Sequence, residues 1–175
     1  ILGAIGAGIS VDFMLGLAQK SNEYNKSLAA LSTQISGATN QIKELDAASR
    51  KLSVQFGTDA LKQSTAFYEI LSAGITDTTQ ATALLTEANR LAIGGNADLM
   101  ISVDGLTSII KGYGNAAGNA SEIADTLFTA SLAGKLSIQE LSENIGKVIP
   151  LATTMGISLE EVTSGISALT LGGIS

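Results

Sequence analysis

A line of mostly apolar side chains runs through the first third of the chain, at steps that alternate between three and four residues. This spacing is a heptad repeat with apolar a and d positions, sustained for about six repeats. One helix cannot bury such a seam alone, so a second helix must cover it, from the same chain or from another copy. We therefore predict a continuous coiled-coil rod. Its seam consists of Met14, Leu17, Ser21, Tyr24, Leu28, Leu31, Ile35, Ala38, Ile42, Leu45, Ser49, Leu52 and Phe56.

The larger seam residues form the predicted interface between copies of the chain. The e and g positions are mostly uncharged, so charge does little to select a partner. Gly37 falls at an outward position, and the register crosses it intact. The alternative is a helical hairpin that turns within residues 36–40. The predicted interface residues are Leu17, Tyr24, Leu28, Leu31, Ile35, Ile42, Leu45, Leu52 and Phe56.

The composition favours an all-α protein with thin cores of small side chains. Hydrophobic residues make up 45% of the 175 residues and aromatic ones only 4%, with 19 glycines and a single proline. No stretch alternates with period two strongly enough to predict a strand. We expect part of the apolar surface to be buried between subunits.

The charge is acidic and uneven along the chain. The net charge is −6, and beyond Arg90 three lysines stand against eight carboxylates. The sequence contains no basic patch that could neutralise phosphates, which argues against sequence-specific nucleic-acid binding. A surface along which DNA slides without sticking and a plain solvated surface fit this acidity equally well.

The first 17 residues are apolar and glycine-rich, with Asp12 as their one charge. They lack the basic start of a signal peptide and are slightly short for a membrane span. We expect a helix buried in protein, and the alternative is a membrane-active segment. The chain begins at Ile1 and reaches residue 175 where a new helix would begin, so we expect it to be a fragment of a longer protein.

After Phe56 the pattern changes to short helices with clear start and stop signals. Residues 57–59 end one helix and begin another, which we expect to reach Ala73, with Gly74 as its left-handed terminator. Thr76 or Asp77 caps the next helix, residues 94–96 break it, and residues 112–119 form the longest loop. We predict two domains: the apolar segment and rod at 1–56, and a compact bundle of short antiparallel helices at 57–175.

An internal repeat of 21 residues lies in the last part of the chain. Residues 137–141 and 158–162 both contain a capping box, in which a Ser and the Glu three residues later satisfy each other's backbone N–H groups. Each box is flanked by a hydrophobic staple pair, Leu136 with Leu141 and Ile157 with Val162. We therefore predict three packed helices with tight links between residues 121 and 171.

The residues available for chemistry are few. The chain has no His, Cys or Trp, which excludes Ser-His and Cys-His nucleophiles and zinc sites built on nitrogen or sulfur. The paired carboxylates Glu140/Glu143 and Glu160/Glu161 lie in first helical turns, where the helix dipole explains acids. We predict no catalytic residue, metal ligand or cofactor, and hence no enzyme. Tyr113, in the expected loop, is the candidate exposed aromatic, or else it packs onto the adjacent helices.

Two glycine clusters could suggest phosphate binding, but neither follows a strand or carries the Lys-Ser/Thr of a P-loop. Helix packing and a loop account for them. These clusters are Gly3, Gly6 and Gly8, and Gly112, Gly114 and Gly118.

From about Gly57 onward the chain resembles the core region of the phage tail tape measure protein family. Each motif alone is a generic helix boundary, but their order and spacing agree with the family over about 120 residues. The motifs are Phe56-Gly57-Thr58, residues 71–75 (LSAGI), Leu91-Ala92, residues 123–127 (IADTL), residues 148–152 (VIPLA), Gly156-Ile157-Ser158, residues 166–170 (ISALT) and Gly172-Gly173-Ile174.

The resemblance implies a structural virion protein. Such a protein sets the tail length during assembly, occupies the lumen or tip of the tail tube, and leaves ahead of the DNA at infection. The implied partners are the protein itself, as a homo-oligomer such as a trimer, tail tube and tip or baseplate hub proteins, tail assembly chaperones, and the host membrane. The implied location is the virion tail, with the host cytoplasm during assembly. Family members often carry a murein hydrolase domain, and none is visible here. The alternative function is a membrane-active helical module, a pore-former or envelope-inserting segment.

Overall fold

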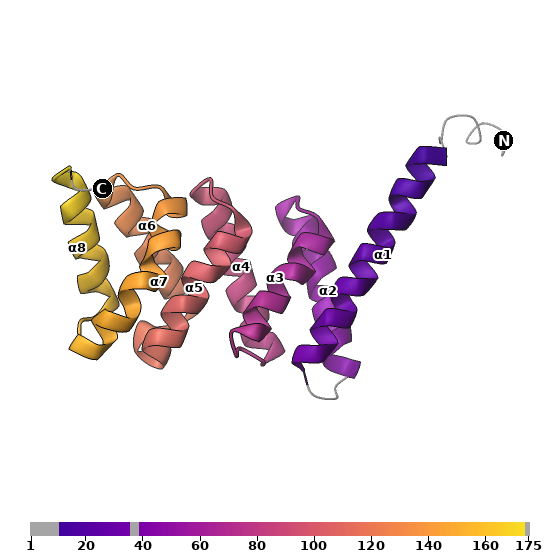
Figure 1. Cartoon of the computed structure of the whole chain (residues 1–175), viewed down its shortest axis with the longest axis horizontal. Helices are drawn as coiled ribbons and strands as arrows, with labels where there is room; N and C mark the ends of the chain where they lie inside the picture. Colours follow the sequence, from indigo (N-terminus) through magenta and orange to yellow (C-terminus); the bar gives the residue numbers. More distant parts are fainter. Residues whose placement is uncertain (1–10, 36–38, 174–175) are drawn as a thin grey trace. The chain divides into compact units, whose positions relative to one another are not determined.

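The computed structural model describes residues 11–35 and 39–173 of the chain. Within these ranges every regular element is a helix, so the all-α prediction is confirmed (Figure 1). None of the described helices is long and apolar enough to cross a membrane. The helices are α1 (Val11–Gln34), α2 (Thr39–Phe56), α3 (Ala60–Ser72), α4 (Thr78–Gly94), α5 (Leu99–Tyr113), the 3-10 helix η1 (Gly114–Ala117), α6 (Ala120–Gly134), α7 (Ile138–Met155) and α8 (Leu159–Leu171).

The chain divides into two compact units, residues 1–68 and residues 69–175. The division falls within α3. The boundary expected from the sequence, between residues 56 and 57, lies inside the first unit. We describe each unit by itself.

The first unit contains a helical hairpin. Helix α1 ends at Gln34 and α2 begins at Thr39, so the prediction of one continuous rod is wrong and the hairpin alternative is correct. The Tyr24 hydroxyl of α1 donates to Asp46 Oδ1 of α2 at 2.7 Å, which shows the two helices side by side. The hydroxyls of Ser27 and Ser64 also share a hydrogen bond, which ties α1 to the first turns of α3.

The heptad repeat could not distinguish a continuous rod from a hairpin, because both arrangements bury the same apolar positions. Two helices folded against each other cover the a and d positions as completely as two copies of a rod would, so an intact register does not distinguish them. Ser36 and Gly37 lie between the two helices, and Thr39 and Asn40 are the first residues of α2; all four are weak helix formers. Residues 36–38, which include the seam position Ala38, lie outside the described residues, as do residues 1–10 of the apolar segment.

The second unit is built from helices with polar N-caps and tight links. Asp77 accepts from Gln80 N, Ser137 from Glu140 N and Ser158 from Glu161 N, so the predicted caps are confirmed. Gly74 and Gly156 have φ of 97° and 72°, as expected of left-handed terminators. Each link satisfies the free N–H and C=O groups of two helix ends within a few residues.

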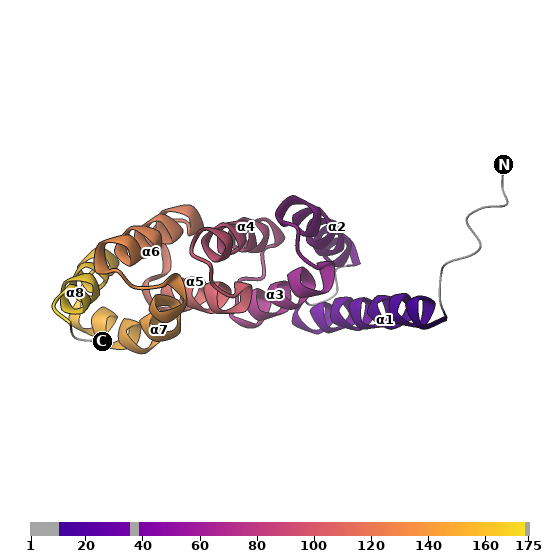
Figure 2. The same ribbon diagram turned by 90° about the horizontal axis from the view of Figure 1, so that it is seen from above.

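In the second unit, a helix packs mainly against the helix that follows it by two in chain order. Helix α5 lies against α7, α6 against α8, and α4 against both α5 and α6. Figure 2 shows the result as two rows, with α4 and α6 in one and α5 and α7 in the other. The core between the rows includes Leu84, Leu106, Ile123, Leu127 and Ile145, all fully buried.

The longest loop predicted, residues 112–119, is largely helical. Gly112 and Tyr113 belong to α5, and residues 114–117 form η1. A Cβ at position 112 would collide with the side chain of Ile149 on α7. Gly112 therefore serves close helix packing and not a turn.

Candidate functional surfaces

One carboxylate of each predicted pair caps a helix, Glu140 in α7 and Glu161 in α8. Glu140 accepts from the Ser137 hydroxyl at 2.7 Å and from its backbone N–H at 3.1 Å, and these two bonds lower the pKa of Glu140. Glu161 accepts from Ser158 N at 2.8 Å, and Glu143 accepts from Gln139 Nε2 at 2.6 Å. In the described part of the chain, no three acidic side chains come together as a metal site would require.

A third capping box begins α6. The Asn119 side chain accepts from Glu122 N at 3.1 Å, and Glu122 Oε2 accepts from Asn119 N at 2.8 Å. This box was not predicted, because residues 112–119 were expected to form one loop. The signal was present, since Asn-x-x-Glu is a variant of the same capping pattern.

The Tyr113 side chain packs against the protein and does not project into solvent. Its hydroxyl donates to the backbone oxygen of Ile157, in the link between α7 and α8, at 2.9 Å. Burial, together with the nearby Glu160 and Glu161, raises the pKa of this phenol. The side chain therefore joins the end of α5 to the α7–α8 link, and the packed alternative is the correct one. Gly114 and Gly118 both have positive φ, and they allow the backbone to turn directly after Tyr113.

The α7–α8 link supports a stability prediction. Ser158→Ala removes the N-cap acceptor and should lower the free energy of unfolding by about 0.5–2 kcal/mol. Gly156→Val should cost more, because a β-branched residue resists φ of 72° and no side chain lies nearby to compensate. Urea unfolding of both variants checks the order. A smaller loss for Gly156→Val than for Ser158→Ala would contradict it.

Five of the nine predicted interface residues are buried within the chain. Leu31 and Leu45 are fully buried, and Tyr24, Ile35 and Leu52 nearly so. Leu28, Ile42 and Phe56 are half-buried, and Leu17 is 50% exposed. The structure thus accounts for most of the seam without a second copy, and the interface between copies stays a prediction.

A polar cluster lies between α1 and α2. Asp46 accepts from the Tyr24 hydroxyl and from Arg50 Nε, the latter at 2.9 Å, and the Arg50 guanidinium lies 4.9 Å from the centre of the Tyr24 ring. Burial, and then the hydrogen bond to Asp46, raises the pKa of Tyr24 to about 12. The cluster joins the two helices by a bond that requires the phenol to keep its proton.

This cluster predicts a loss of stability in alkali. Between pH 10 and 12 the unfolded chain has released the Tyr24 proton while the folded chain retains it, so stability falls as the pH rises. The contribution is fully present below about pH 10. Tyr24→Phe should flatten the dependence of the urea midpoint on pH between about 9 and 11.5. Equal slopes for the natural chain and the variant would contradict the prediction.

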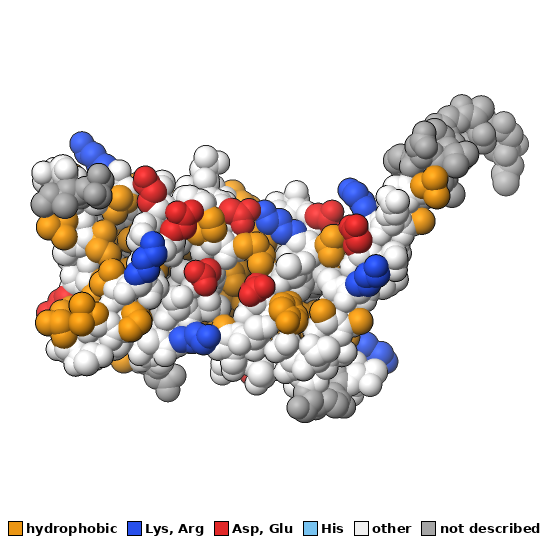
Figure 3. Space-filling view, viewed as in Figure 1, with side chains coloured by type: hydrophobic (Ala, Val, Ile, Leu, Met, Phe, Trp, Pro, Cys, Tyr) orange, Lys and Arg blue, Asp and Glu red, His pale blue; other side chains and the backbone are white. Residues whose placement is uncertain are grey.

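One groove stands out on the second unit because its lining is almost wholly apolar. It lies between α7 and α8 and has a volume of about 330 Å³. Leu151 and Met155 of α7 are 64% and 66% exposed, and Leu169 of α8 is also exposed. Figure 3 shows hydrophobic side chains gathered where these two helices meet. We call this surface the α7–α8 groove; its lining is Val148, Leu151, Ala152, Met155, Ile157, Glu161, Val162, Gly165, Ile166 and Leu169.

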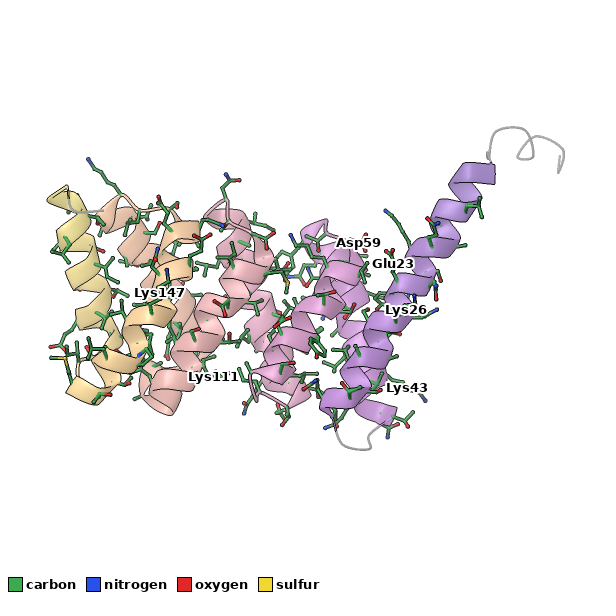
Figure 4. All side chains as sticks on the ribbon, in the orientation of Figure 1. Glu23, Lys26, Lys43, Asp59, Lys111 and Lys147 are labelled. Atoms are coloured by element: carbon green, nitrogen blue, oxygen red, sulfur yellow. The ribbon has the colours of Figure 1, made fainter. Side chains whose placement is uncertain are left out.

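Charged groups are sparse beside the α7–α8 groove. Lys147, which Figure 4 shows on α7, donates to Asn144 Oδ1 at 2.8 Å. Glu161 is engaged in its capping box. The groove can therefore bind an apolar helix face, and it lacks the fixed charges that a polar ligand or nucleic acid would need.

Comparison with known proteins relates the chain to phage tail proteins. The sequence matches the family described as "Phage-related minor tail protein" over residues 46–175. It is also 29% identical over 84 residues to the "Tape measure protein" of Pneumococcus phage Dp-1. That match covers 48% of this chain and 7% of the phage Dp-1 protein. No solved structure matches the chain.

The family match covers most of the chain, including all of α3 to α8. The short motifs named above fall inside the matched range. Residues 56–58, 71–75 and 156–158 lie at helix ends, whereas residues 91–92, 123–127 and 148–152 lie within α4, α6 and α7. The chain belongs to the phage-related minor tail protein family, whose members are proteins of the virion tail.

Proposed function

We propose that this chain is part of a tail tape measure protein, which sets the length of the phage tail during assembly. The likeness to the tape measure protein of phage Dp-1 carries the proposal. The same role includes residence in the tail lumen or tip and release ahead of the DNA. It is structural and not enzymatic.

Two properties of the molecule support this role. In each of the two carboxylate pairs considered for catalysis, one member caps a helix, Glu140 in α7 and Glu161 in α8. Residues 69–175 carry eleven carboxylates and four basic side chains, among them Lys111 and Lys147. A surface of this sign repels phosphates, and so suits a protein that shares a channel with DNA without gripping it.

The experiment is an in-frame deletion of residues 11–56 in the full-length protein, with tail length measured by electron microscopy. A hairpin of this size is as long as its longer helix, so the tails should shorten by roughly 35–40 Å if it lies along the tail. As a matched control, an unrelated helical hairpin of the same helix lengths should restore the natural length. Tails of unchanged length after the deletion would refute the proposal for this segment.

We also propose that copies of the protein associate in the tail, through the part of the seam that the chain leaves exposed. Leu17 is the exposed member of the predicted interface, whereas Leu45 is fully buried. Residues 1–175 contain no cysteine, so Leu17→Cys places one thiol at a defined position of this segment. It should form disulfide-linked dimers in assembled tails, and Leu45→Cys should not. Absence of dimers with Leu17→Cys would count against this association.

The alternative function is a membrane-active module. No described helix is long and apolar enough to cross a membrane, so none of them supports it. Flotation of the chain with liposomes tests it directly. Binding that depends on residues 1–17 would support it over the tape measure role for that segment.

A further inference from the structure

Helix α7 carries two apolar faces, and only one of them has a partner among the described residues. The buried face consists of Ile138, Leu141, Ile145, Ile149 and Ala152. The second face is formed by Val148, Leu151 and Met155, which follow one another at steps of three and four. This is the spacing of a helix-packing stripe, and it forms one wall of the α7–α8 groove.

The packing order of the second unit indicates what covers such a stripe. From α4 onward each helix lies against the helix two places along, as α5 does with α7 and α6 with α8. Helix α5 packs on one side of α7, whereas Leu151 and Met155 on another side remain 64% and 66% exposed, with α8 forming only the opposite wall of the groove. In stacked helical arrays an uncovered apolar face marks an interior position, because terminal helices have polar outer faces.

The sequence after α8 repeats the signal that starts α8. Gly156, with φ of 72°, donates its N–H to Thr153 O, and Ile157 and the N-cap Ser158 follow. Gly173, with φ of 81°, donates its N–H to Thr170 O in the same way. Residues 174–175 lie outside the described residues, but their sequence is again Ile-Ser. The same three residue types therefore follow the end of both helices.

We propose that the α7–α8 groove receives a further helix of the same polypeptide, which lies outside residues 1–175 and continues the two-row stack. The tape measure protein of phage Dp-1, of which the matched segment is only 7%, shows that a relative has ample chain for this. The occupant is an amphipathic helix with an apolar stripe, capped by a residue equivalent to Ser158. It packs on α7 as α7 packs on α5.

The test is thiol labelling at the groove, in the full-length protein and in the chain of residues 1–175. Leu151→Cys and Met155→Cys replace exposed side chains, so both variants should fold. In the 1–175 chain both thiols should react with a maleimide as fast as Ser121→Cys, an exposed position away from the groove. In the full-length protein both groove thiols should react at least about tenfold more slowly, because a packed helix excludes the reagent, while Ser121→Cys is unchanged.

Dilution separates the proposed occupant from a second copy. A helix of the same polypeptide protects the thiols equally at every protein concentration, whereas a second copy releases them on dilution. Protection that disappears on dilution would overturn the proposal in favour of self-association. Equal labelling of Met155→Cys in the two proteins would overturn it outright, whatever the outcome of the tail-length experiment.

Discussion

Leu45→Asp is expected to lower the free energy of unfolding of the first unit by about 3–5 kcal/mol. Leu45 is fully buried in α2. An unpaired carboxylate at such a position is strongly unfavourable, because the interior offers no water to solvate the charge. Far-UV circular dichroism during urea unfolding measures the loss.

The matched control is Val54→Asp on the same helix. Val54 is 85% exposed, so the variant should change stability by no more than about 0.5 kcal/mol. Light scattering of both variants distinguishes packing within the chain from packing between copies. If Leu45→Asp dissociated an oligomer and left the melting temperature unchanged, Leu45 would face another copy and the hairpin would not account for the seam.

The local signals of the sequence predicted the second unit well. Caps at Ser137 and Ser158 and terminators at Gly74 and Gly156 were placed correctly, and of the two cap candidates Thr76 and Asp77 the structure shows Asp77. These features succeed because capping depends on residues within one turn of each other, which a single sequence displays. At Gly112 the glycine was expected to mark a loop, but it lies within α5, where close contact with Ile149 of α7 requires it.

The choice of packing partner could not be predicted from the periodicity. The stripe through Leu31 and Leu45 showed that a partner helix exists, but not that α1 and α2 supply it for each other. In α7, the buried Ile145 and the exposed Leu151 look alike in the sequence. Periodicity reports which side chains share a face, and only the fold shows which faces are covered.

Gly105→Val is expected to force α5 and α7 apart and to cost about 3 kcal/mol of stability. A Cβ at Gly105 would lie 2.9 Å from Ser142 Cβ and 3.2 Å from Ser142 Cα, and the backbone there cannot yield as a flexible side chain could. The small gain in helix propensity over glycine, a few tenths of a kcal/mol, does not offset this overpacking. Urea unfolding followed by circular dichroism measures the net effect.

Gly165→Ala provides a control of opposite sign. Gly165 lies within α8 with open space around the position of its missing Cβ, so alanine there should stabilise the protein by about 0.5–1 kcal/mol. A second check is Gly105→Val in a Ser142→Gly background, where its cost should fall by about 1 kcal/mol or more because the two sites are in contact. Full additivity of the two changes would show that Gly105 does not set the approach of α5 to α7. The coupling would instead establish that small residues at facing positions, and not large interdigitating ones, set how closely these two helices of the tail protein pack.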